Sequence, residues 1–113
     1  MKKLLICLAG VGIIITACSK GNSAVTAVDC TGEAKSFVTD VNPVIQANCT
    51  SPGCHNSGSN NGPGALIAYQ QIFNARISIR AAVASGSMPQ GGSLSASQKN
   101  TILCWIDNGG ANN

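Results

Sequence analysis

The side chains best suited to chemistry in this chain are two thiols and one imidazole within residues 49–55. Cys49 and Cys54 enclose four residues, and His55 follows Cys54 directly. Thiolates and imidazoles bind metals, two thiols form a disulfide, and the sequence C-x-x-C-H is a signal for covalent haem attachment. Because the gap here is longer than in that signal, the rest of the chain must decide between these chemistries.

Covalent haem attachment needs two thiols that add across the two vinyl groups and a histidine that reaches the iron. Pro52-Gly53 is a turn dipeptide, so the longer gap can loop outward while Cys54 and His55 stay adjacent. An electron-transfer haem commonly takes a methionine as its second axial ligand. Met88 precedes Pro89, which disfavours helix at Met88. We therefore predict that His55 and Met88 face each other across the iron.

The remaining cysteines have uses of their own. Cys18 follows small residues at the end of an apolar run, which makes it a candidate for lipidation. Cys30 and Cys104 are then left over, and two spare thiols in an oxidising compartment are expected to pair. The alternative is that Cys104, beside Trp105, is a buried small apolar residue.

The beginning of the chain is typical of an exported protein. Lys2 and Lys3 precede an apolar run that has the length of a signal peptide and is short for a membrane-spanning helix. The run ends like the lipobox of bacterial lipoproteins. We expect a signal peptide at residues 1–17 and a lipidated, flexible tether over residues 18–28, anchored through Cys18 on the periplasmic side of a membrane. An ordinary signal peptide with an incidental cysteine is the alternative.

The charge of the chain argues against nucleic-acid binding. The formal net charge is +3, from seven basic and four acidic residues. Without Lys2 and Lys3, five basic residues face four acidic ones, which gives a net charge near +1. Lys and Arg form no cluster, and such a cluster is what a nucleic-acid partner requires.

The spacing of apolar residues predicts an all-α domain over residues 29–113. No alternating pattern persuasive of a strand occurs. Apolar residues at helical spacing predict a short helix over residues 37–48. Pro43 suits its first position, with Asn42 as the cap. If the helix instead starts near Thr39, Pro43 still lies in its first turn, where proline is tolerated.

Two further helical regions follow the motif. Residues 66–85 are broadly helical, either as one helix or as two, and Gly86 is expected to end them. Ser95 and Gln98 fit a capping box for a last helix. Asn-Gly-Gly at residues 108–110 is expected to stop that helix.

With these features the chain resembles the small c-type cytochrome domains of bacterial envelopes over about residues 30–112. The segments that carry the resemblance are Val41-Asn42-Pro43-Val44-Ile45, Cys49 to His55, Ser87-Met88-Pro89, Leu94-Ser95 and Cys104-Trp105-Ile106-Asp107-Asn108-Gly109. The resemblance implies a helical fold wrapped around one covalent haem c. Cys49 and Cys54 would form the thioethers, His55 and Met88 would bind the iron, and Trp105 would pack near the haem. It implies an electron carrier that serves redox partner proteins and has no small-molecule substrate.

Two other readings of the same residues stay open. Cys49, Cys54 and His55 supply three ligands for a structural zinc ion, and Cys30 or Cys104 would be the fourth. Adjacent ligands at Cys54 and His55 are awkward for one tetrahedral ion. A dithiol oxidoreductase or a plain binding lipoprotein would instead join Cys49 to Cys54, although redox dithiols usually have a two-residue gap beside a β-α-β pattern.

Overall fold

The computed structural model describes residues 28–113, which form a helical domain without strands. A π-helical turn, η1 (Phe37–Val41), leads into helix α1 (Asn42–Cys49), and helices α2 (Tyr69–Ser85) and α3 (Ala96–Asp107) follow. The predicted all-α class is therefore confirmed for the described residues. The predicted signal peptide, the lipidated Cys18 and nearly all of the tether lie outside them. Among residues 28–113, no helix is both long and apolar enough to cross a membrane.

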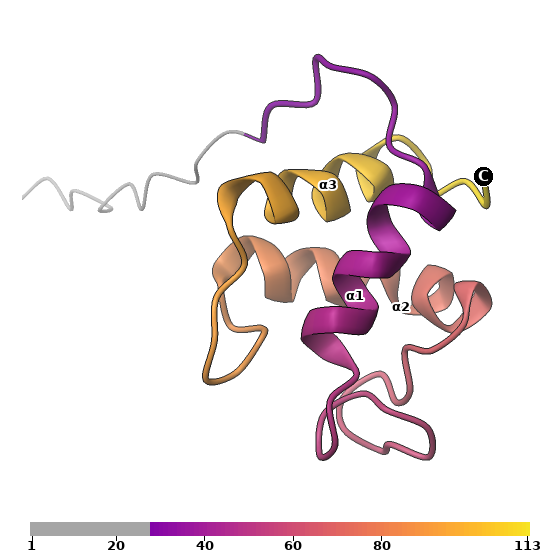
Figure 1. Cartoon of the computed structure of the whole chain (residues 1–113), viewed down its shortest axis with the longest axis vertical. Coiled ribbons are helices and arrows are strands. Elements are labelled where there is room, and N and C mark those ends of the chain that lie inside the picture. Colours follow the sequence, from indigo (N-terminus) through magenta and orange to yellow (C-terminus); the bar gives the residue numbers. More distant parts are fainter. Residues whose placement is uncertain (1–27) are drawn as a thin grey trace, which may run out of the picture.

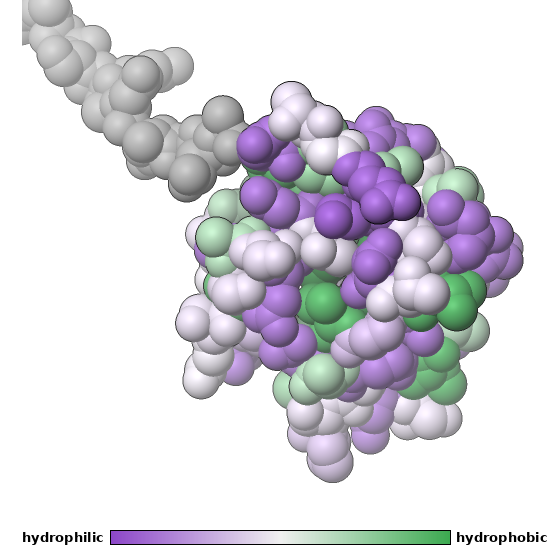
Figure 2. All heavy atoms as spheres, turned by 45° about the horizontal axis from the view of Figure 1, so that its top comes forward, coloured by the Kyte–Doolittle hydropathy of each residue, from purple (hydrophilic) through white to green (hydrophobic). Residues whose placement is uncertain are grey.

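Helices α2 and α3 lie side by side and run in opposite directions, and η1 and α1 cross this pair (Figure 1). The core fills the space between them. Its largest fully buried side chains come from all of these elements: Val41, Ile45, Ile72, Ile102 and Trp105. On the face drawn in Figure 2, hydrophobic residues form small separate areas among hydrophilic and neutral ones.

The predicted helix over residues 37–48 is helical as expected, but its first turn, η1, is π-helical and its cap is not the predicted one. Ser36 is the cap of η1, and its Oγ accepts a hydrogen bond from the Thr39 N–H over 3.3 Å. Backbone bonds in η1 join residues five apart, as from Val41 N to Ser36 O over 3.1 Å. The prediction of Asn42 as the cap is wrong, because the chain is already helical there. Pro43 has no N–H to donate to the preceding turn, so an irregular turn at this point loses few backbone hydrogen bonds.

The predicted C-terminal ends of the two later helices and the capping box of the last one are confirmed, whereas α2 begins at Tyr69 and not at residue 66. Helix α2 is one continuous helix and ends at Gly86, whose φ of +76° is easily adopted by glycine. Helix α3 begins with the capping box. Ser95 Oγ accepts from Gln98 N over 3.1 Å, and Gln98 Oε1 accepts from Ser95 N over 2.9 Å.

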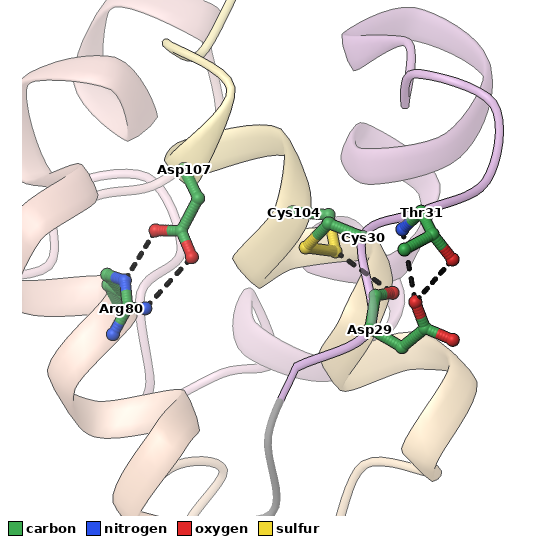
Figure 3. The surroundings of a disulfide bond; sticks show 6 residues. All are labelled: Asp29, Cys30, Thr31, Arg80, Cys104 and Asp107. Atoms are coloured by element: carbon green, nitrogen blue, oxygen red, sulfur yellow. Dashed lines mark hydrogen bonds and ion pairs between the residues drawn. A yellow bond between two sulfur atoms is a disulfide. The ribbon is translucent and has the colours of Figure 1, made fainter.

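Two links fasten other parts of the chain to α3 (Figure 3). Cys30 and Cys104, the cysteines left for a bridge, are joined by a disulfide with a Cα–Cα distance of 5.4 Å. The Arg80 guanidinium of α2 makes two bonds to the Asp107 carboxylate, of 2.6 and 2.9 Å. This pair holds the pKa of Asp107 below its usual value, because the carboxylate accepts these bonds.

Candidate functional site

A pocket of about 370 Å³ lies where the motif loop approaches the segment that connects α2 to α3. The four residues predicted to bind haem, Cys49, Cys54, His55 and Met88, all line it. The other lining residues are Asn48, Gly53, Asn61, Gly62, Pro89 and Gln90. Residues from distant parts of the sequence therefore meet at one cavity.

Each end of the pocket is positioned by a helix. Helix α1 ends at Cys49 and so delivers the first thiol. On the other side, Met88 follows the end of α2, and its N–H donates to Ala82 O over 3.3 Å. Met88 is half-buried. The thioether thus belongs to a loop that is tied back to the preceding helix.

The residues between the two cysteines form a closed turn. Cys54 N donates to Ser51 O over 2.9 Å, around Pro52 and Gly53. Gly53 has a φ of +82°, which suits glycine at this position of a turn. His55 N then donates to Cys49 O over 2.9 Å, so the two ends of the gap are bonded to each other. The four-residue gap is accommodated without opening the motif.

His55 is buried, with 7% of its surface exposed, and its ring is oriented by the backbone. Its Nδ1 lies 2.8 Å from Gly64 O. Since a carbonyl oxygen only accepts, Nδ1 donates in this bond, and Nε2 has the lone pair in the neutral form of the ring. A neutral imidazole whose other nitrogen is held by a carbonyl is the usual form of a metal-binding histidine. His55 is therefore prepared for ligation through Nε2.

The loop over residues 56–64 folds back on the motif and supplies contacts that sequence reasoning missed. Asn61 Nδ2 donates to Gly53 O over 2.7 Å and to Cys54 O over 3.2 Å. Ser59 Oγ also donates to Cys54 O. The only sequence signal was the richness of this loop in Asn and Ser, whose side chains often bind nearby backbone.

The two free thiols differ in their surroundings. Cys49 is half-buried and Cys54 is exposed. Burial raises the pKa of the Cys49 thiol, and the nearby Cys54 raises it further. Cys49 therefore stays protonated at neutral pH. The disulfide between Cys49 and Cys54 that a dithiol protein would form is absent from the described structure.

The fourth ligand that the zinc interpretation requires is not supplied by Cys30 or Cys104 in the described structure. Cys30 and Cys104 are bonded to each other, so neither is free to join the motif. Over residues 28–113, no group of three or more His, Cys, Asp or Glu side chains is arranged to hold a metal ion. The residues around the pocket therefore do not match the four-ligand set of a structural zinc site.

Trp105, which the resemblance implies packs near a haem, lies in the core of the helical domain. It is not among the residues that line the pocket. Its ring packs against Phe37, at a centroid distance of 5.5 Å, and against Tyr69, at 6.4 Å. Its Nε1 donates to Ala111 O over 2.8 Å. This face of α3 is turned toward η1 and the start of α2, so Trp105 is a core residue of the helical domain.

Comparison with protein-family models, curated proteins and solved structures found no match to this chain. The chemistry of the site must therefore be argued from its own residues. Two thiols, an imidazole prepared to bind through Nε2 and a thioether share one pocket. This donor set fits a haem c held by two thioethers with histidine and methionine as axial ligands.

Proposed function

We propose that the domain carries one covalently attached haem c and transfers single electrons. The observation that supports this proposal is the single pocket lined by Cys49, Cys54, His55 and Met88. Cys49 and Cys54 would form the thioethers, and His55 Nε2 and the Met88 sulfur would be the axial ligands. When bound, the haem supplies reversible one-electron chemistry. The helical fold would then wrap around one haem.

The chain's own residues would set the properties of the bound group. The Gly64 carbonyl fixes the His55 ring and makes it a better electron donor. Methionine as the second ligand raises the reduction potential. Because both axial positions would be filled by protein, we propose an electron carrier without a small-molecule substrate, not an enzyme.

The partners would be redox proteins at a membrane surface, reached by a chain that is lipid-anchored at Cys18 on the periplasmic side. The pocket lies in a part of the chain without formal charge. Residues 41–75 and 81–98 contain no Asp, Glu, Lys or Arg. Encounters at an uncharged surface are only weakly steered by electrostatics. We expect the rate of electron exchange with a partner to change little between low and high salt.

The test is expression of the full chain in cells that have a haem-maturation system. We expect a Soret band and haem that stays with the chain on a denaturing gel. Cys54→Ala leaves one thiol in the motif and should abolish the two-thioether product, so that at most one thioether forms. His55→Ala should remove the low-spin spectrum, and Met88→Ala should remove the weak red absorption band of methionine-ligated ferric haem.

Gln90→Ala is the matched control, since Gln90 lines the same pocket and has no ligand for iron. It should leave the spectrum unchanged. A wild-type protein without a Soret band and without covalent haem would overturn the proposal. Stoichiometric zinc in that same sample would favour the zinc reading instead.

A further inference from the structure

The gap between the two cysteines is longer than in the usual haem signal, and a longer loop has more conformations in which the thiols are misplaced. The backbone bond from His55 N to Cys49 O closes the loop at its ends. The carbonyls just before His55 need partners of their own. Ser59 Oγ donates to Cys54 O, and the Asn61 side chain donates to both Cys54 O and Gly53 O.

We propose that Asn61 is a positioning residue that holds the long intercysteine loop so that both thiols and His55 present themselves to the haem together. Its Nδ2 lies 2.7 Å from Gly53 O and 3.2 Å from Cys54 O. One amide group has two N–H donors, so a single side chain satisfies both carbonyls. This inference rests on the proposed function and concerns how its site is assembled.

Asn61 is itself fixed by the same loop. Its backbone N–H donates to Ser59 Oγ over 3.2 Å, and its carbonyl accepts from Gly64 N over 2.9 Å. Gly64 O in turn accepts from His55 Nδ1 over 2.8 Å. Asn61 and Gly64 therefore act on neighbouring parts of the motif, and movement of Asn61 is transmitted to Cys54 and His55.

The geometry requires the N–H donors of the Asn61 side-chain amide, and not merely a side chain of that size. Asp has nearly the same shape but no N–H, and its carboxylate would face two carbonyl oxygens. Asn61→Asp therefore removes the contact with the smallest change in packing. Asn60 is the exposed neighbour on the same loop, so Asn60→Ala is the matched control.

The first experiment counts thioethers. The full-length wild type, Asn61→Asp, Asn61→Ala and Asn60→Ala are matured with haem. The ratio of chains with two thioethers to chains with one is then measured by mass spectrometry of haem peptides. We expect both Asn61 variants to lower this ratio about threefold, the effect of losing a modest exposed hydrogen bond. Asn60→Ala should match the wild type, and an unchanged ratio in Asn61→Asp would overturn the inference.

A variant with a shorter loop between the two cysteines tests whether Asn61 acts on that loop or supports the fold in general. Deletion of Ser51 and Pro52 gives the two-residue spacing of the usual signal. In that background Asn61→Ala should no longer lower the thioether ratio. An equal loss in both backgrounds would show that Asn61 supports the fold in general, and would overturn the inference.

A second readout does not depend on haem. In the full chain produced without haem maturation, Asn61→Asp should change the ratio of Cys54 to Cys49 alkylation rates, whereas Asn60→Ala should not. An unchanged ratio would overturn the positioning role. If the wild type takes up no haem while this ratio does change, the proposed function fails and the positioning of Cys54 by Asn61 stands.

Discussion

Loss of the Cys30–Cys104 disulfide should remove much of the stability of the domain. The bridge joins residues 74 apart in sequence, so it closes a loop of nearly the whole described chain. On the loop-entropy model such a bridge stabilises by about 4.5 kcal/mol. Small domains have a total stability of about 5–15 kcal/mol. The bridge also fastens the segment around Cys30 to the buried Cys104, and the hydrogen bonds between Asp29 and Thr31 in that segment are only local.

The assay is urea unfolding followed by Trp105 fluorescence. The variant Cys30→Ala/Cys104→Ala is compared with its parent in a Cys49→Ala/Cys54→Ala background, so that no free thiol can exchange with the bridge. With a dependence of about 1 kcal/mol per molar urea, the midpoint should fall by about 4 M or the folded baseline should be lost. Chemical reduction of the Cys30–Cys104 disulfide in the parent should lower the urea midpoint by the same amount without any substitution. A shift below about 1 M would refute the loop-entropy reasoning and point to a compact unfolded state.

Three further predictions test the environment of single groups. Iodoacetamide should alkylate Cys54 several-fold faster than Cys49 at pH 8, as followed by peptide mapping. Cys49 should gain reactivity only at higher pH, because its pKa is raised. Equal alkylation rates of the two thiols would contradict this. Trp105→Ala should destabilise the fold by about 3–5 kcal/mol in urea unfolding, and a loss below about 1 kcal/mol would place the ring outside the core. Asp107→Asn should cost below about 1 kcal/mol at neutral pH, since its pair with Arg80 is largely exposed. Because the pair lowers the pKa of Asp107, this difference should disappear as the pH falls through the folded pKa. A difference that does not decrease at all on acidification would contradict the pairing.

The helices could be predicted where their signals are local. The capping box of Ser95 and Gln98, and the glycine that ends α2, depend on side chains and backbone within a few residues. The span of the first helix could be predicted from its apolar spacing, but its cap and its π-helical first turn could not. A π-helical turn has no distinct pattern of apolar residues, and the cap is Ser36, six residues before the expected cap Asn42.

In the candidate site too, residues with a signal of their own could be predicted, and contacts that depend on the folded chain could not. Cys49, Cys54, His55 and Met88 were predicted because their side chains are ligands by type. The partners of the motif were missed for two reasons. Gly64 O is a backbone acceptor, which leaves no trace in residue type. Asn61 and Ser59 are polar loop residues of ordinary type, and their contacts depend on how the loop folds back. The packing partners of Trp105 could not be predicted from the sequence, because they depend on which face of α3 meets η1.

The four-residue gap was the weakest feature of the haem interpretation, and the structure gives it a physical account. What attachment requires is that both thiols and His55 reach one pocket, and the number of intervening residues matters only through that requirement. Here the extra residues form a turn at Pro52-Gly53, and the bond from His55 N to Cys49 O brings its ends together. Asn61 then satisfies carbonyls that the turn exposes. A longer gap is therefore compatible with the same donor arrangement, provided that a second loop holds it closed.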